Sequence, residues 1–253
     1  MFKYEDFISR NYLFIDNKLQ QSIKKIKLGF AGVGLASMMA EMAVRVGFEN
    51  FILSDSDHVE TSNLNRQNYV ASDVGNAKLL SLKNRLLSIN PEIHIELMEK
   101  GIKNNSDINY IVDKSDILIN TIDFGEEYFK LVETACQYNK LIICLFNPGF
   151  GGLAVCFKYG TGSLYDLLKT NKIEYGLEFS KKLILSNEAI QIGQEMRNNL
   201  DSLLSQIQVS GYEPQLVIGT CMSSAIGLNC IIKYINHETI PYCPQVIFKG
   251  FYM

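Results

Sequence analysis

A cluster of acidic and amide-bearing side chains follows an apolar run near residue 50. The run Asn50–Ser54 has the composition of a buried strand, and the polar stretch from Asp55 to Gln67 comes directly after it. A carboxylate placed here can accept hydrogen bonds from ribose hydroxyls, while asparagine and arginine can donate to phosphate oxygens. Such polar side chains are not expected in a hydrophobic core, so the residues of this stretch indicate a nucleotide ligand.

A glycine-bearing turn precedes this polar stretch. Residues Ala31 to Ser37 read Ala-Gly-Val-Gly-Leu-Ala-Ser, between an apolar run and a helical pattern. At such a turn, Gly32 and Gly34 would let backbone N–H groups approach a phosphate at the N-terminus of the following helix. Tight packing alone also explains small residues here, so the turn by itself has little specificity.

The spacing between the turn and the first acid suits a nucleotide site. Asp55 stands 21 residues after Gly34, a separation typical of an acid that binds a ribose hydroxyl. An NAD-dependent oxidoreductase explains this spacing as well as an ATP-dependent enzyme does. A lone aspartate at a strand end can also serve only as a turn former.

The stretch from Asp55 to Gln67 resembles the signature of the ThiF/MoeB/HesA family, which includes the ubiquitin-activating enzymes. It reads Asp-Ser-Asp-His-Val-Glu-Thr-Ser-Asn-Leu-Asn-Arg-Gln, and the resemblance covers roughly residues 7–150. The family's turn usually reads Gly-x-Gly-Gly-x-Gly-Ser. This chain keeps two of those residues and replaces three glycines (Gly34 and Ser37 are kept; Ala31, Val33 and Ala36 are replacements).

The resemblance implies roles for the polar residues. The residue matching Asp55 holds the ribose, and those matching Asn63, Arg66 and Lys78 contact the phosphates. Asp123, after the fourth predicted strand, helps to position Mg²⁺, for which it is a hard oxygen ligand. Two residues of the stretch have less specific roles: Asp57 assists the metal or shapes the turn, and Gln67 supports its neighbours.

Carboxylate adenylation explains why these residue types belong together. A substrate carboxylate attacks the α-phosphate of ATP and pyrophosphate leaves, so catalysis consists mainly of positioning and of neutralising phosphate charge. Arg66 and Lys78 would supply fixed positive charge. The resemblance therefore implies an ATP- and Mg²⁺-dependent adenylyltransferase whose partner is a ubiquitin-like sulfur-carrier protein, or a peptide, with a C-terminal glycine.

A second match lies near the N-terminus. Phe7-Ile-Ser-Arg10-Asn resembles the family's Tyr-Ser-Arg-Gln element, whose arginine reaches the ATP site of the neighbouring subunit in bacterial members. The resemblance implies that Arg10 acts in trans as an arginine finger and that the protein is a homodimer. A surface arginine without a role is the alternative.

The cysteines limit the chemistry that follows adenylation. None of the six forms a Cys-x-x-Cys pair, so we expect no structural zinc site and mostly reduced, buried thiols. Ubiquitin-activating enzymes carry a thioester cysteine in the region matching 158–215, where this chain has none. A catalytic thiolate needs partial exposure and an electropositive setting. The positions of Cys156, Cys221 and Cys230 in apolar runs promise neither, so we expect adenylation without a thioester step.

Composition excludes several classes of protein. With 253 residues, 47% hydrophobic and 20% charged, the chain suits one large α/β domain. Its net charge of −3 provides no basic field for nucleic acid. The N-terminus lacks the pattern of a signal peptide, so we expect a cytoplasmic protein. The uncharged stretch Gln215–Ile232 is polar enough to predict a buried helix rather than a membrane span.

Alternating strand and helix patterns predict the elements that position these residues. Strands are expected at Ile26–Ala31, Phe51–Ser54, His94–Met98, Asp116–Ile122 and Leu141–Phe146. Helices are expected at Ala36–Val46, Gly75–Ile89 and Glu126–Tyr138, with a short helix or turn at Ile108–Asp113. This order predicts a Rossmann-like α/β fold, with a mainly parallel sheet and helices on both faces.

Two segments flank the predicted nucleotide-binding core, 26–150, in a single domain that spans residues 1–253. Residues 1–25 form a helical arm, and 151–253 form an antiparallel and helical extension on the substrate side. The extension comprises a strand, a polar excursion that is a lid or a surface loop, two helices and an edge strand (Leu153–Phe157, 158–182, Leu183–Gln208, Leu216–Tyr234 and Gln245–Phe251).

Two other functions stay open at this point. An NAD-dependent oxidoreductase explains the glycine turn and Asp55, but it leaves Arg66, Lys78 and Asp123 without a common task. A non-catalytic family member that retains the nucleotide pocket would explain the replaced glycines and the missing cysteine.

Overall fold

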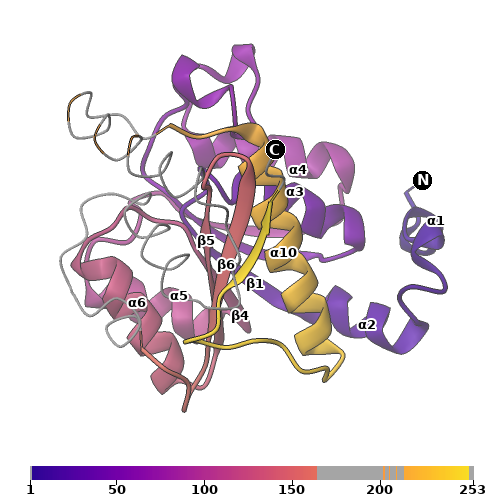
Figure 1. The fold of residues 1–253 in the computed structure, drawn as a ribbon. Coiled ribbons are helices and arrows are strands. Elements are labelled where there is room, and N and C mark those ends of the chain that lie inside the picture. Colours follow the sequence, from indigo (N-terminus) through magenta and orange to yellow (C-terminus); the bar gives the residue numbers. More distant parts are fainter. Residues whose placement is uncertain (1, 164–201, 203–204, 206–208, 210–213, 251–253) are drawn as a thin grey trace.

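The computed structural model describes residues 2–163, 202, 205, 209 and 214–250. Its strands are β1 (Lys27–Ala31), β2 (Asn50–Ser54), β3 (His94–Met98), β4 (Ile117–Asn120), β5 (Leu141–Phe146), β6 (Gly151–Phe157) and β7 (Ile247–Gly250). They form one seven-stranded sheet in the order β3-β2-β1-β4-β5-β6-β7 (Figure 1). β1 to β5 are parallel, whereas β6 and β7 are antiparallel additions at one edge. The predicted Rossmann-like, mainly parallel sheet is confirmed.

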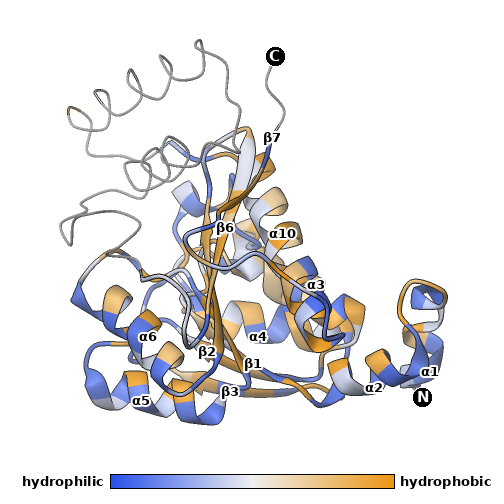
Figure 2. Ribbon diagram, turned by 60° about the horizontal axis from the view of Figure 1, so that its bottom comes forward, coloured by the Kyte–Doolittle hydropathy of each residue, from blue (hydrophilic) through white to orange (hydrophobic). Residues whose placement is uncertain are grey.

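Helices cover both faces of this sheet. One face carries α2 (Asn17–Lys25), α3 (Ser37–Val46), α4 (Lys78–Ile89) and α10 (Val217–Ile235), and the other carries α5 (Asn105–Lys114) and α6 (Glu126–Gln137). Shorter helices are α1 (Tyr4–Phe7), η1 (Ser9–Asn11), η2 (Thr61–Asn63) and η3 (Ala71–Asp73). Figure 2 shows mostly hydrophobic central strands between helices of mixed hydropathy, as expected for amphipathic helices packed on a buried sheet.

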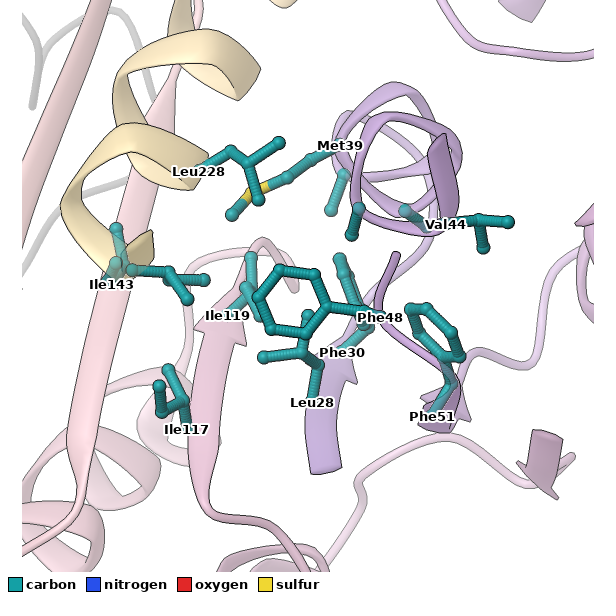
Figure 3. Close-up of a cluster of buried hydrophobic side chains, with 14 of the residues drawn as sticks. Leu28, Phe30, Met39, Val44, Phe48, Phe51, Ile117, Ile119, Ile143 and Leu228 are labelled. Carbon is teal, nitrogen blue, oxygen red and sulfur yellow. The ribbon is translucent and has the colours of Figure 1, made fainter. Parts of the chain in front are cut away.

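Side chains alternate along the strands between the two faces. Phe30 and Phe51 pack with Met39 of α3 and Leu228 of α10 (Figure 3). Ile52, the next residue along β2, belongs instead to the core under α5 and α6. β4 and β5 are buried over their whole length, which explains their uninterrupted apolar sequences.

The apolar helix α10 is a core helix of this domain. By length and composition alone it would also suit a membrane span, but here it packs against β6, β5 and α3. A glycine permits its close approach, because a Cβ on Gly152 would come 2.3 Å from the backbone nitrogen of Ser223. The stretch predicted as a buried helix is a helix in the structure, and one of its sides is buried against the sheet and α3.

Within residues 26–150, three element boundaries differ from the prediction by two residues or more. α4 begins at Lys78 rather than Gly75, because Gly75 has a φ of +88° in a turn that closes on the carbonyl of Val59. α5 is a full helix of ten residues, because the side chain of Asn104 caps its first turn. β4 ends at Asn120, two residues before the predicted end.

The extension continues the sheet rather than forming a separate layer. β6 begins at Gly151, two residues earlier than predicted, and β7 is the predicted edge strand. The predicted helix Leu183–Gln208 and residues 164–182 of the predicted excursion lie almost entirely outside the described residues.

The N-terminal arm is anchored at the C-terminal end of α3. The hydroxyl of Tyr4 donates to the carbonyl of Gly47 at 2.9 Å, and the amide of Gln20 donates to both Tyr4 and the carbonyl of Val46. Asn11 adds a donation to the same Val46 carbonyl at 3.0 Å. These bonds hold the arm at the end of α3 that lies away from the glycine turn.

A buried carboxylate joins α3, α4 and the polar stretch behind the glycine turn. Glu41 is 9% exposed and accepts from Asn68 at 2.7 Å, from Arg85 at 2.5 Å and from Arg45 at 2.9 Å. Ser37 extends the network, since its hydroxyl donates to the carbonyl of Gly34 and accepts from the backbone of Asn68. Burial alone would raise the pKa of Glu41, but these hydrogen bonds outweigh it and the pKa is lowered.

We expect Glu41→Gln to lower the free energy of unfolding by about 2 kcal/mol at neutral pH, because it weakens charge-assisted bonds to partly buried partners. Glu92→Gln, at an exposed glutamate, is the matched control and should change the unfolding free energy by less than about 0.5 kcal/mol. The folded-state pKa of Glu41 is depressed, so its stabilisation is present above the ordinary value of 4.5 and is lost as pH falls through the lowered pKa. Urea unfolding of both variants measures this; a Glu41→Gln deficit that persists unchanged in acid contradicts the assignment.

Candidate functional site

A cavity of about 560 Å³ opens at the carboxyl ends of β1, β2, β4 and β5. In open α/β sheets, ligands bind at this edge where the strand order reverses, here between β1 and β4. The cavity wall includes all of the predicted site residues except Arg10 and Asn63; those present are Gly32, Gly34, Asp55, Asp57, Arg66, Gln67, Lys78 and Asp123.

The glycine turn forms the floor of the cavity next to the start of α3. Gly32 has a φ of +84°, and a Cβ there would come 2.7 Å from the carbonyl oxygen of Thr121. A Cβ on Gly34 would come 3.2 Å from the side-chain amide of Gln67. The N-cap residue of α3, Ala36, makes no side-chain capping bond. The first turn of α3 is therefore suited to an anion, as the sequence predicts.

Asp55 connects the end of β2 to the glycine turn. Its Oδ2 accepts from the backbone of Val33 at 2.8 Å, and its Oδ1 accepts from the backbone of Asp57 at 2.9 Å. A carboxylate has acceptor sites for more than two donors, so the predicted bond to a ribose hydroxyl is compatible with both contacts. Tyr69 supports the same turn by donating to the carbonyl of Val33 at 2.8 Å. Burial raises the pKa of Tyr69, so its hydroxyl stays protonated and remains a donor.

Lys78 reaches the cavity from the first residue of α4. Its ammonium forms an ion pair with Asp57 at 2.9 Å, and its backbone N–H donates to the Asp57 carbonyl at 2.9 Å. Lys78 is only 7% exposed, whereas the side chain of Asp57 is 62% exposed. Asp57 therefore orients Lys78, a role more specific than the sequence indicated.

Arg66 is held by contacts from two distant parts of the chain. Its Nη1 donates to the carbonyl of Ser62 at 2.7 Å and to Oδ1 of Asn65 at 2.8 Å. Its Nε donates to Oε1 of Gln215 at 2.5 Å, across 149 residues of sequence. Gln215 itself lines the cavity.

Two predicted residues lie outside the cavity wall. Asn63 is buried, and its Oδ1 accepts from the backbone of Glu60 at 3.0 Å, so its side chain closes a turn and its position does not favour the predicted phosphate contact. Arg10 lies on the N-terminal arm, next to the residue that contacts Val46. The ten-residue helix α3, about 15 Å long, separates that end from the cavity. Arg10 therefore does not reach the cavity of its own chain.

Asp123 offers an oxygen ligand for a metal. It lines the cavity, is exposed, and makes no hydrogen bond or ion pair with the described residues. Within the described part of the chain, no three metal-ligating side chains gather in one place. These facts fit Mg²⁺, which usually takes one or two carboxylates and completes its shell with phosphate oxygens and water.

The cavity wall carries more acidic than basic groups. Among the residues that the structure describes, its carboxylates are Asp55, Asp57, Asp123 and Glu127, and its cations are Arg66 and Lys78. The formal charges of these residues sum to a net negative value before any ligand or metal binds. A polyphosphate in this cavity requires positive charge beyond that of these residues.

The cysteines mostly follow the prediction of buried thiols. Cys144, Cys156, Cys230 and Cys243 are buried, and burial raises the pKa of Cys144 to about 12. Cys221 is exposed on α10, contrary to expectation, because it lies on the side of the helix that faces away from the core. None of these cysteines lines the cavity.

Several lining residues were not identified from the sequence. Asn147 follows β5 and Thr121 follows β4, so the rule that placed Asp55 at a strand end applies to both. Glu127, in the first turn of α6, lies four residues after Asp123. Gln215 carries no comparable signal, because only the packing of α10 brings it to the cavity.

Comparison with known proteins identifies a matching family and several relatives of this chain. The model of the ThiF family matches residues 8–224. A tRNA threonylcarbamoyladenosine dehydratase from Bacillus subtilis (strain 168) is 26% identical over 220 residues, 81% of this chain and 85% of that protein. A probable molybdopterin-synthase adenylyltransferase from Gracilaria tenuistipitata var. liui is 28% identical over 159 residues, 61% of this chain. The match covers only 44% of that relative.

Solved structures support the fold. E. coli MccB crystallised with ATP aligns with a TM-score of 0.69 over 97% of this chain and 71% of that chain, at 19% identity. PaaA aligns with a TM-score of 0.70 over 97% of this chain and 79% of that chain, at 18% identity. At such low identity the likeness concerns the arrangement of the elements.

The glycine turn provides a matched pair of substitutions. Gly32 and Gly75 both have positive φ, but a Cβ meets the backbone at 2.7 Å only in the first case and finds nothing within 4 Å in the second. We expect Gly75→Ala to lower the unfolding free energy by about 1 kcal/mol, and Gly32→Ala by at least about 1 kcal/mol more. Urea unfolding measures both, and equal losses would show that the turn has room for a side chain.

Proposed function

Because this chain belongs to the ThiF family, we propose that it is an ATP-dependent adenylyltransferase. Its substrate would be the C-terminal carboxylate of a ubiquitin-like carrier protein or of a peptide. The observation that carries the proposal is the convergence on one cavity of four charged side chains from separate segments. These are Asp55, Arg66, Lys78 and Asp123.

The lining residues divide the work of holding ATP. Asp55 is placed to accept from the ribose, and the glycine turn with the start of α3 is placed to receive phosphates. Lys78 can retain Asp57 and still donate to a phosphate, because an ammonium has three donors. Arg66 supplies the second cation of the wall.

The proposed reaction is an in-line displacement at the α-phosphorus. An oxygen of the substrate carboxylate forms a bond to phosphorus, and the bond from phosphorus to the bridging oxygen of the β-phosphate breaks. Pyrophosphate leaves with the electron pair of that bond, and an acyl-adenylate remains. Arg66 and Lys78 balance the charge that develops on the phosphates. Mg²⁺, which Asp123 would hold, supplies further neutralisation when bound.

Charge distinguishes this reaction from the alternatives. The two cations of the wall, Arg66 and Lys78, support a triphosphate ligand over NAD. The binding of NAD would leave Lys78 and Asp123 without a function. The net charge of −3 supports a carboxylate on a protein or peptide over one on nucleic acid. The same net charge therefore disfavours, for this chain, a tRNA substrate of the kind named for the Bacillus subtilis relative.

The positions of the cysteines bear on the fate of the acyl-adenylate. Since none of the described cysteines lines the cavity, we propose that no thioester forms on this chain. A nucleophile from a second molecule, or from the substrate itself, would then attack the activated carbonyl and release AMP.

The arm residue Arg10 supports a homodimeric enzyme. The described residues of the cavity wall are net negative, whereas Arg10 is exposed and makes no hydrogen bond or ion pair with the described part of the chain. Beside it, three large apolar side chains are 70%, 84% and 92% exposed, namely Tyr12, Leu13 and Phe14. We propose that a second copy of the chain covers this turn and receives Arg10 in its cavity.

Exchange of labelled pyrophosphate into ATP tests the activity. With a carrier protein or peptide ending in Gly-Gly, we expect Lys78→Ala to lower the exchange rate by about 10²–10³-fold, because a phosphate-binding cation is lost. Lys83→Ala, on the same helix but outside the cavity wall, should leave the rate unchanged. ATP with Mg²⁺ should raise the melting temperature and NAD should not. Binding of ATP without exchange with any partner would instead indicate a non-catalytic family member.

Mixing two inactive variants tests the trans role of Arg10. Arg10→Ala and Asp123→Ala should each lose exchange activity, but a mixed dimer holds one intact cavity facing one intact arginine. After subunit exchange at equal amounts, we expect recovery of roughly a quarter of wild-type activity, since half of the dimers are mixed and each has one good site. No recovery, with mixed dimers shown to form by native mass spectrometry, would place Arg10 outside the reaction.

A further inference from the structure

We propose that Gln215 is a positioning residue for Arg66, and that Asn147 fixes Gln215 by pinning the first turn of α10 to the end of β5. The inference rests on the proposed function, because it concerns the cation that this function assigns to the phosphates. It gives the extension beyond residue 150 a direct part in the nucleotide site.

The guanidinium of Arg66 is oriented from two sides. Nη1 is bound by Ser62 and Asn65 of its own segment, whereas Nε is bound by Gln215 at 2.5 Å. The guanidinium is planar, so acceptors at Nε and at Nη1 together fix the direction of the whole group. Gln215 therefore adds an acceptor at Nε to the acceptors that the local segment provides at Nη1.

Asn65 closes a ring of contacts around the same point. Its Oδ1 accepts from Arg66 at 2.8 Å, and its Nδ2 donates to the backbone carbonyl of Gln215 at 3.2 Å. Gln215 is thus held through its backbone while its side chain holds Arg66. The three residues Asn65, Arg66 and Gln215 form a closed set of hydrogen bonds between the polar stretch and α10.

Asn147 determines where α10 begins. Its Nδ2 donates to the carbonyl of Leu216, the N-cap residue, at 2.8 Å and to the hydroxyl of Thr220 at 2.9 Å. Its Oδ1 accepts from the backbone of Gly149 at 3.0 Å, which fixes the orientation of the amide. Asn147 is 8% exposed, so these bonds lie in a largely dehydrated place where they are strong.

The packing around Asn147 leaves the helix little freedom. A Cβ on Gly219 would come 2.0 Å from Oδ1 of Asn147. One turn further along, the hydroxyl of Ser223 donates to the carbonyl of Phe146 at 2.5 Å. The first turns of α10 are therefore fixed on the end of β5. Because Gln215 directly precedes the N-cap residue, its position is fixed as well.

Fixing an arginine in advance has a consequence for catalysis. A free arginine side chain has rotamer entropy that would otherwise be lost when ATP binds. In the observed arrangement that loss occurs on folding. The charge is then oriented before the transition state forms, which is where oriented charge lowers a barrier.

A double-mutant cycle tests whether Gln215 acts through Arg66. We expect Gln215→Ala to lower kcat for pyrophosphate exchange by about tenfold, with a melting temperature close to that of wild type. In the Arg66→Ala background the same substitution should have no further effect on kcat or on Kd for ATP. Additive losses would overturn the inference, because Gln215 would then contact substrate directly or act only on stability.

Asn147→Asp supplies the second arm of the test. The substitution keeps the size of the side chain and the acceptor for Gly149, but it removes both donations to α10. We expect it to lower kcat by at least a similar factor, and by less in the Arg66→Ala background, where only the added negative charge in the cavity wall still acts. A wild-type protein that neither exchanges pyrophosphate nor binds ATP would refute the proposed function. An active wild type with additive effects at 147, 215 and 66 would refute this inference alone.

Discussion

The carboxylate of Asp55 is the contact on which the candidate site depends. One oxygen holds the backbone of Val33 in the glycine turn, and the other holds the backbone of Asp57. Asp57 in turn holds Lys78 at the start of α4. The ends of two strands and the starts of two helices are therefore joined through a few side chains, whose geometry is set before any ligand arrives.

A second layer makes this arrangement rigid. Behind the turn, Ser37 and Asn68 connect Gly34 to the buried carboxylate of Glu41. Glu41 also draws Arg85 of α4 against α3. Because the carboxylate is largely removed from water, each of its bonds is stronger than the same bond at the surface. The polar stretch is thus held both at the cavity and behind it.

The extension after residue 150 contributes more than an edge to the sheet. β6 and β7 continue the sheet, and β6 provides the surface on which α10 packs. Small residues on both elements, such as Gly152 and Gly219, allow backbones to approach each other. Close packing places the start of α10 beside the polar stretch. The two halves of the chain therefore meet at the hydrogen bond between Arg66 and Gln215.

The sequence alone was sufficient for the parallel core and for the acidic end of β2. Apolar runs and glycine or proline boundaries predicted β5 to the residue, and the family resemblance pointed to Asp55, Lys78 and Asp123, which all lie in the cavity wall. These predictions succeed because strand and helix patterns are local, and because the carboxyl ends of parallel strands meet at one edge. The start of α4 was wrong because the conformation of Gly75 depends on its contact with Val59.

Only the tertiary structure decided which polar residues face the cavity. Asn63 and Gln67 belong to the same polar stretch, yet the side chain of Asn63 closes a turn and is absent from the cavity wall, which Gln67 lines. Gln215 is adjacent to Arg66 although 149 residues separate them. Residue type determines which bonds a side chain can make, whereas the packing of α10 on β6 determines which partners come within reach. That packing depends on the summed contacts of distant segments, which no local pattern in the sequence records.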